Sequence, residues 1–273
     1  MVERFFFTSQ TDVHRREPDP ITLLSGPPSW AWLLMGGKRN KRKSKCPILA
    51  ASCLFASQVK GIGKTSMLFQ FAFNSASESC SGNRNVVFIC NRRRLETKPP
   101  FLSQGIDPSS DVFQHIKMKY IEDDEGIKKY FAAFHMHDTF PAAIVIDNFG
   151  DFFNEWNCQE RHRNPRGRDL AMVHTLALCH NAITHANQKG PCQLLLSDTH
   201  QGDAPRLLYI YKRWIQTIFV VKGDGFGSFL LKYNNYAASG NAKRTRTAKY
   251  SIAFQYLLLE GITEDSDQEL LTD

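Results

Sequence analysis

The 273-residue sequence contains no Cys-x-x-Cys pair and no apolar run long enough to cross a membrane. Its seven cysteines are odd in number and scattered, so neither a disulfide framework nor a zinc knuckle is expected. The N-terminal residues reach Asp12 and Arg15 without the apolar core of a signal peptide. We therefore expect a soluble, intracellular protein with no membrane partner.

Acidic residues are absent from one stretch, residues 30–61, which holds seven lysines and arginines. The rest of the chain is balanced, because the whole chain has 34 lysines and arginines, 34 minus 7 is 27, and there are 27 acids. The formal charge of +7 therefore describes this segment alone. It does not by itself indicate a nucleic-acid partner for the remainder.

Short apolar runs alternate with amphipathic stretches, a pattern typical of helices on both faces of a largely parallel sheet. We predict one α/β domain over residues 21–261, after an N-terminal extension at 1–20 and before an acidic tail at 262–273. The predicted elements are strands at 21–24, 86–90, 115–121, 142–147 and 193–197, helices at 65–79, 122–137 and 169–188, and C-terminal antiparallel strands at 217–221, 228–233 and 250–259.

Gly63-Lys64-Thr65-Ser66 opens a predicted helix and matches the end of the phosphate-binding motif Gly-x-x-x-x-Gly-Lys-Ser/Thr. In that motif backbone N–H groups surround the phosphates, the lysine supplies positive charge and the hydroxyl binds Mg²⁺. The contiguous match is defective, because Gln58 stands where the first glycine belongs. The apolar residues 21–24 followed by Gly26-Pro27-Pro28-Ser29 supply a better first half, and removing 32 residues restores the spacing.

The segment 30–61 is interpreted as an insertion into this loop, a retained intron or a gene-model error, because a phosphate nest needs consecutive amides at fixed dihedral angles. An uninterrupted exon across these codons would contradict that interpretation. The alternative is a functional basic loop that binds nucleic acid or directs nuclear import through residues 38–43.

The apolar run 142–147 ends in Asp147, which is expected at the carboxyl end of a strand, where parallel sheets bind their ligands. There it can hold Mg²⁺ through water, together with the Thr65 hydroxyl. The two signals predict a P-loop NTPase that binds ATP and Mg²⁺.

Outside the segment 30–61, the chain resembles the RecA-like recombinase ATPases, and most of all the small paralogue that partners a SWIM-domain zinc protein in the Shu complex. The residues that carry the likeness are 26–29, 63–69, 86–93, 116–120, 144–147 and 194–197. The resemblance implies a RecA-like P-loop core and a nuclear ATP-binding protein, a weak ATPase, in homologous-recombination DNA repair. It also implies the SWIM-domain protein, other recombinase paralogues and, weakly, single-stranded DNA as partners.

One departure from this family concerns hydrolysis. Recombinases carry a glutamate just beyond the strand after the P-loop helix, where it orients the attacking water. Here residues 91–94 read Asn-Arg-Arg-Arg and the nearest carboxylate is Glu96. A guanidinium stays protonated and cannot act as a base, so we assign no catalytic residue. The run of arginines at residues 92–94 is either a solvated turn or a contact to phosphate.

The alternative functions are an inactive P-loop scaffold in a DNA-repair complex and a small-molecule P-loop kinase.

Contact with single-stranded DNA is expected from the loop 151–168, whose basic residues lie beside aromatic ones; they are Arg161, Arg163, Arg166 and Arg168. A solvated loop with Phe152 and Phe153 covering the core is the alternative. Residues 200–206 and 243–249 are weaker candidates. Thr199 and His200 resemble the recombinase position that senses the γ-phosphate, with simple loop hydrogen bonding as the alternative.

Overall fold

The computed structural model of the chain describes residues 2–5, 51–57, 63–79, 84–200, 205–215, 217–224, 227–235 and 245–265. These residues belong to one unit, made of Met1–Phe7 and Leu49–Asp273. Within it, helices and a large, mostly parallel sheet form a mixed α/β structure.

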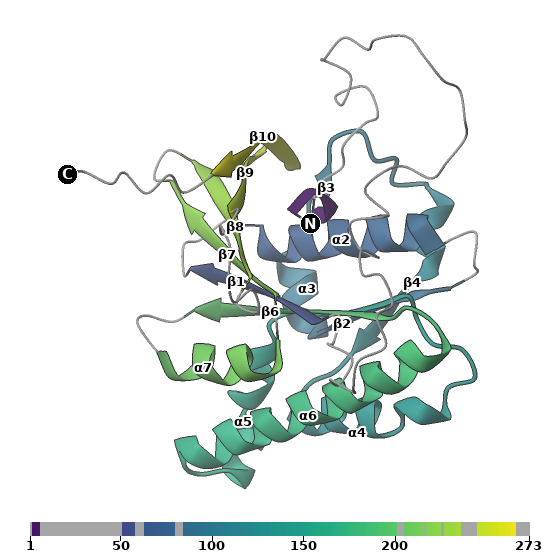
Figure 1. Cartoon of the computed structure of the whole chain (residues 1–273), viewed down its shortest axis with the longest axis vertical. Coiled ribbons are helices and arrows are strands. Elements are labelled where there is room, and N and C mark those ends of the chain that lie inside the picture. Colours follow the sequence, from purple (N-terminus) through teal and green to yellow (C-terminus); the bar gives the residue numbers. More distant parts are fainter. Residues whose placement is uncertain are drawn as a thin grey trace, which may run out of the picture. The chain divides into compact units, whose positions relative to one another are not determined.

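The described strands form a single sheet in the order β3-β10-β9-β8-β7-β1-β6-β5-β2-β4 (Figure 1). The strands are β1 Ala51–Ser57, β2 Val86–Cys90, β3 Leu102–Ser103, β4 Ile116–Tyr120, β5 Ala143–Ile146, β6 Gln193–His200, β7 Thr217–Gly223, β8 Ser228–Asn235, β9 Thr245–Ala253 and β10 Tyr256–Asp265. Neighbours from β7 to β4 pair in parallel, whereas β7 to β10 pair antiparallel. The predicted parallel sheet with antiparallel C-terminal strands is confirmed.

Helices cover both faces of this sheet, α2 and η1 on one side and α4, α6 and α7 on the other (Figure 1). The helices are α2 Lys64–Ser79, α3 Arg92–Thr97, α4 Asp124–Ala132, α5 Trp156–Arg161, α6 Pro165–Lys189 and α7 Pro205–Trp214, with 3-10 turns η1 Val2–Phe5, η4 Asp111–His115, η5 Phe134–Met136 and η6 Phe149–Phe153. Among the described helices, none has the length and apolar character needed to cross a membrane.

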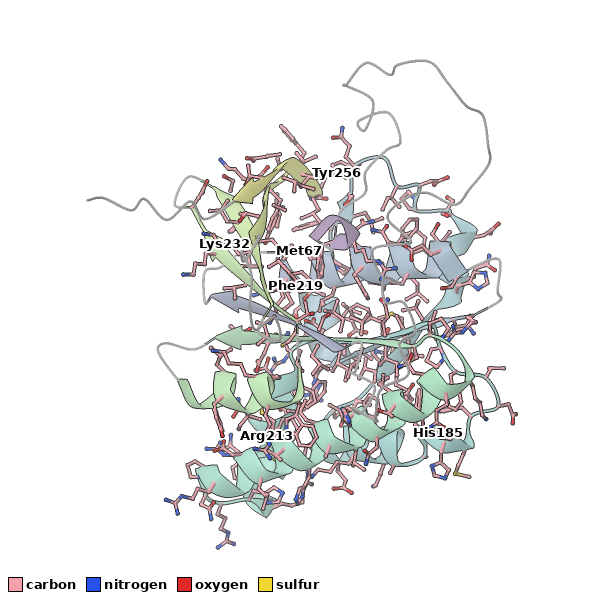
Figure 2. The ribbon with its side chains drawn as sticks, in the orientation of Figure 1. Met67, His185, Arg213, Phe219, Lys232 and Tyr256 are labelled. Carbon is pink, nitrogen blue, oxygen red and sulfur yellow. The ribbon has the colours of Figure 1, made fainter. Side chains whose placement is uncertain are left out.

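Two apolar clusters fill the space on either side of the sheet. Met67 of α2 and Phe219 of β7 belong to the cluster on the α2 side (Figure 2). The ring of Phe5 joins them, with its centroid 4.9 Å from that of Phe219. This residue was assigned by sequence to an N-terminal extension, but its side chain is part of the core.

Strand β1 differs from the sequence-based expectation. Residues 51–57 lie in the segment interpreted as an insertion, yet they form a strand between β6 and β7. Cys53 and Leu54 are both fully buried, one in each apolar cluster, because successive side chains of a strand point to opposite faces. Residues 21–24 and Gly26–Ser29 lie outside the described residues, so the two-part phosphate loop stays a prediction.

Three other boundaries differ from those expected. The long helix begins at Pro165 instead of residue 169, because Asn164 Oδ1 accepts a hydrogen bond from Gly167 N at 2.6 Å and caps it. The helix expected at 122–137 ends at Ala132 and is followed by η5. The strand expected at 250–259 is a hairpin of β9 and β10.

Candidate functional site

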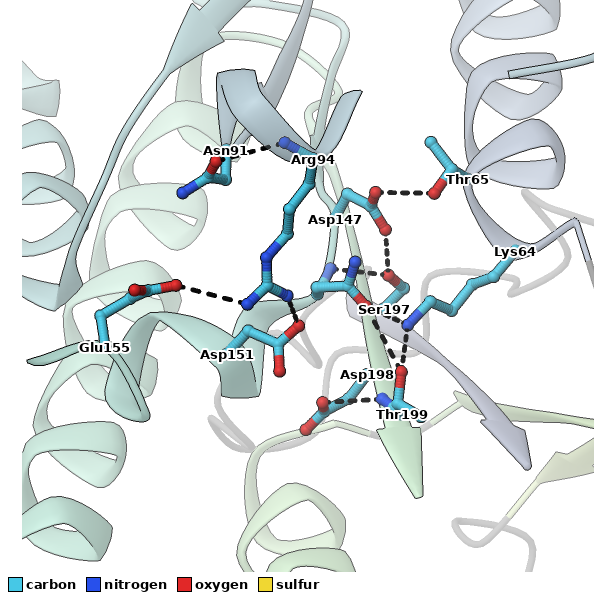
Figure 3. Close-up of polar contacts among 11 residues, drawn as sticks. Lys64, Thr65, Asn91, Arg94, Asp147, Asp151, Glu155, Ser197, Asp198 and Thr199 are labelled. Carbon is cyan, nitrogen blue, oxygen red and sulfur yellow. Dashed lines mark hydrogen bonds and ion pairs between the residues drawn. The ribbon is translucent and has the colours of Figure 1, made fainter. Parts of the chain in front are cut away.

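Polar side chains from several elements meet at the carboxyl edge of the parallel strands (Figure 3). Lys64 and Thr65 are the first residues of α2, and Asp147 follows β5 directly. The end of β6 contributes residues 197–199. Carboxyl ends of neighbouring parallel strands share one edge, which is where α/β sheets bind ligands.

Asp147 is held by hydroxyl groups on both of its carboxylate oxygens. Thr65 Oγ1 donates to Asp147 Oδ2 at 2.8 Å, and Ser197 Oγ donates to Oδ1 at 2.9 Å. The backbone N–H of Asn148 donates in turn to Ser197 Oγ at 2.9 Å. The predicted metal pair of Thr65 and Asp147 is therefore brought into contact. Ser197 was missed as a site residue, although a polar residue at the end of an apolar strand could have indicated it.

Lys64 reaches across the same edge to neutral acceptors. Its Nζ donates to Thr199 Oγ1 at 2.6 Å and also to Asn148 Oδ1. Burial lowers the pKa of Lys64, and the nearby carboxylates of Asp147 and Asp198 oppose that shift. Among the described residues Lys64 forms no ion pair, so its charge is not directly neutralised. Such a lysine is suited to bind an anion.

Gly63 shapes the start of α2. Its φ is +68°, which favours glycine, and its carbonyl accepts the hydrogen bond from Met67 N at 2.9 Å. An added Cβ would lie 2.4 Å from Ile252 Cδ1 of β9. The Ser66 side chain is buried and accepts from Phe101 N at 2.9 Å, so its hydroxyl is structural. What remains for an anion at this point is the N-terminus of a helix, whose first N–H groups have no acceptor within the helix.

A buried carboxylate, Asp198, fixes the end of β6 beneath Lys64. Its Oδ1 accepts from Thr199 N at 2.7 Å and its Oδ2 from the Tyr211 hydroxyl at 2.7 Å. Burial raises the pKa of Asp198, and hydrogen bonds from Tyr211 and from the Gly150 backbone partly oppose this. A Cβ at Gly150 would lie 2.5 Å from Asp198 Oδ2. Sequence reasoning missed this residue's role, because its partners come from three separate elements.

Directly after β2, where the resemblance implies a glutamate, lies Asn91, whose Oδ1 accepts from Arg94 N at 3.4 Å at the start of α3. Glu96 pairs with Arg92 at 2.7 Å on an exposed surface.

Arg94 forms ion pairs with Asp151 and, at 3.3 Å, with Glu155 (Figure 3). A small depression beside Asp147 is lined by Asn91, Arg94, Asp147, Asn148, Asp151, Phe152 and Glu155. The carboxylates of Asp151 and Glu155, which the sequence did not indicate as site residues, therefore lie near the edge, and both form ion pairs with Arg94.

The two predicted sensor residues have different outcomes. Thr199 contacts Lys64, as described above, so it belongs to the site. His200 is the last residue of β6, and its side chain lies outside the described residues.

The predicted DNA-binding arginines are not equivalent. Arg161 is paired with Asp123 at 3.5 Å and with Asp124, so it is not a free cation. Arg163 and Arg166 are exposed and Arg168 is half-buried, and none of the three forms an ion pair within the described part of the chain.

The segment 151–168 is largely α5 and the first turn of α6 instead of an open loop. Phe152 and Phe153 are buried in the core, as the alternative reading held, while Trp156 is 74% exposed.

The two weaker basic candidates lie only partly within the described residues. Lys249 of the segment 243–249 lies in β9 and pairs with Asp224 at 3.4 Å and Glu260 at 3.5 Å. Residues 201–204 of the other segment lie outside the described residues.

Comparison with known protein families finds no family model that matches this chain, and comparison with curated proteins finds no match. The site is therefore interpreted from its own geometry.

Proposed function

We propose that the chain is a RecA-like ATP-binding protein whose nucleotide site is the edge formed by Lys64, Thr65 and Asp147. The observation that carries this proposal is Lys64, a part-buried cation that donates to neutral oxygens at the start of a helix. A polyphosphate would supply negative charge beside Lys64 and accept from the first N–H groups of α2, which have no acceptor within the helix.

The donor set beside Lys64 fits Mg²⁺. This ion prefers hard oxygen ligands and keeps several waters, and the edge offers one hydroxyl and one carboxylate in contact at 2.8 Å. Thr65 and Asp147 would hold the ion, directly or through water. When bound, Mg²⁺ neutralises charge on the phosphates, while Ser197 keeps the Asp147 carboxylate oriented.

The topology supports a contiguous phosphate loop. β1 ends at Ser57 and α2 begins at Lys64, so residues 58–63 join a buried strand to a helix, as the motif requires. The helix after β1 lies on one face of the sheet and α7, which precedes β7, lies on the other (Figure 1). Because α7 follows β6, the neighbour of β1, the connections that leave these two strands go to opposite faces, which opens a crevice at their carboxyl ends. The contiguous loop has Gln58 in place of the first glycine, and it competes with the two-part loop beginning at Gly26.

Hydrolysis is proposed to be weak. Asn91 cannot act as a base, and Asp151 and Glu155 are both ion-paired with Arg94. These ion pairs favour the second candidate, a P-loop scaffold that binds nucleotide as a structural ligand.

A nuclear role in homologous recombination, with a SWIM-domain protein, other recombinase paralogues and single-stranded DNA, rests on the family resemblance. For DNA, the exposed Arg163, Arg166 and Trp156 support it.

The test of nucleotide binding is Lys64→Ala, with Lys232→Ala of the exposed β8 surface as the matched control. Loss of charge-assisted hydrogen bonds costs about 1.5–3 kcal/mol, so the affinity for Mg-ATP should fall about 10- to 150-fold. Calorimetric titration measures the affinity, and thermal unfolding checks that each variant is folded. Equal ATP affinity in the folded Lys64→Ala variant and the wild type would refute the site.

Phosphate release separates the two candidates once binding is shown. Release that single-stranded DNA stimulates favours an ATPase, whereas tight binding without release favours the scaffold. Transfer of phosphate to a small acceptor would instead indicate a kinase.

A further inference from the structure

Three potential metal ligands, none of them among the site residues described above, meet where the start of α4 lies beside α5. They are Asp124, the first residue of α4, Cys158 of α5, and His162, which ends α5. One ligand atom from each lies within 4.8 Å of the other two. Cys158 and His162 are four residues apart, so a helical turn places both on one side of α5.

The chemistry of this trio suits one metal. Thiolate, imidazole and carboxylate are the three ligand types that Zn²⁺ takes in proteins, and three protein ligands leave a fourth position for water. The side chains of Asp124 and Cys158 are fully buried, and His162 is half-buried at the surface. These three side chains come from two segments that only the fold brings together. We propose that Asp124, Cys158 and His162 form a Zn²⁺-binding site.

Two cations compete with the metal for Asp124. Lys128 Nζ donates to its Oδ2 at 2.6 Å, and Arg161 donates to its Oδ1. Arg161 is partly exposed and already has a second partner in Asp123 at 3.5 Å. It can therefore turn to Asp123 and free Oδ1 for the metal. Lys128 would remain on Oδ2 and hold the carboxylate in orientation, as hydrogen bonds to metal-ligating carboxylates do.

Charge and protons balance in this arrangement. In the structure the thiol of Cys158 donates a hydrogen bond to Asp124, so its proton must leave before the sulfur can bind the metal. Coordination releases that proton to solvent, and affinity should therefore rise with pH. The bound site would contain two carboxylates, Asp123 and Asp124, and one thiolate, against Lys128 and Arg161. That excess of one negative charge favours a divalent cation.

A bound metal would join the start of α4 to residues 162–164, which connect α5 to α6. This connection carries Arg163, and Arg166 lies in the first turn of α6 that follows it, so the metal would fix the backbone that presents both exposed arginines. The inference does not depend on the nucleotide site, because it uses none of the residues assigned to that site.

Cobalt is the probe, because Co²⁺ occupies Zn²⁺ sites and absorbs light. The untagged full chain, kept reduced with a phosphine, is titrated with Co²⁺. We expect a single equivalent to bind with tetrahedral ligand-field bands and a sulfur-to-metal charge-transfer band, all lost when Zn²⁺ is added. Cys158→Ser should abolish the charge-transfer band, whereas Cys179→Ser, a change at another buried cysteine, should keep it. His162→Ala should weaken binding at least about tenfold.

A variant that should bind Co²⁺ more tightly is also needed, because a loss of Co²⁺ binding can also result from a variant that does not fold. Arg161→Gln removes a competing cation without touching a ligand, so Co²⁺ should bind about tenfold more tightly. Absence of tight Co²⁺ binding in the wild type overturns the proposal. So does a charge-transfer band that survives Cys158→Ser, or an affinity that Arg161→Gln leaves unchanged. Mg-ATP affinity, measured separately, reports on the other site.

Discussion

Leu54→Ala tests whether β1 is a strand of the sheet. The Leu54 side chain is 0% exposed and belongs to the apolar cluster under α2. It pairs in register with Ser197 of β6 and Phe219 of β7, at the centre of the sheet. If residues 51–57 belonged to an insertion outside the fold, this leucine would have no such neighbours.

The expected loss follows from burial. Replacing a buried leucine by alanine costs about 2–5 kcal/mol, and a central, two-sided position leaves little room for the neighbours to relax. We therefore expect about 3 kcal/mol less unfolding free energy. In a domain of this size that corresponds to a Tm lower by about 6–12 °C. Urea unfolding followed by circular dichroism measures the free energy directly. Leu170→Ala is the matched control, because this leucine of α6 is 55% exposed, and it should cost about 0.5 kcal/mol or less.

Leu23→Ala completes the comparison, because the insertion hypothesis places the strand before α2 at residues 21–24. A loss below about 0.5 kcal/mol for Leu54→Ala, together with a large loss for Leu23→Ala, would refute the position of β1. The reverse result would support a phosphate loop that starts at Gln58. Deleting residues 30–61 would then remove a central strand instead of repairing the site.

Two further changes test the geometry of the edge. Gly63→Ala should cost about 1–2 kcal/mol for its left-handed backbone, plus the overlap with Ile252. The cost should be smaller in an Ile252→Val background, which lacks the Cδ1 atom, and strict additivity in urea unfolding would contradict the predicted contact. Asp198 has a raised pKa in the fold, so its contribution to stability is full below the unfolded pKa of about 3.9 and is lost as pH rises through the folded pKa. Asp198→Asn should therefore flatten the pH dependence of unfolding free energy above about pH 4, and an unchanged slope would show that another group is responsible.

The sequence alone was sufficient to predict the site residues that belong to a motif or lie at the end of an apolar strand. Lys64 and Thr65 were predicted from a motif with a local mechanism, and Asp147 from its place at the end of an apolar strand. Thr199 was predicted from its resemblance to the recombinase position that senses the γ-phosphate, and it contacts Lys64.

Other parts of the site could not be predicted, because they depend on tertiary contacts. Arg94 and Asp151 are far apart in sequence, and only the packing of η6 near α3 brings them together. Strand β1 was missed because its sequence, Ala-Ser-Cys-Leu-Phe-Ala-Ser, has no β-branched residue and no alternation of polar and apolar side chains. The hairpin between β9 and β10 was missed because Phe254 and Gln255 form its turn with positive φ, where glycine or asparagine is usual.

The pairing of β1 also dictates when it can fold. Within the described residues its strand partners are β6 and β7, which begin at Gln193 and Thr217. During synthesis the strand therefore has no edge to join until well over half of the chain has been made. Contacts of such long range slow folding and leave apolar surface open to other chains. A chain truncated before β6 would expose β1 permanently, so C-terminal truncations should aggregate instead of yielding a smaller folded unit.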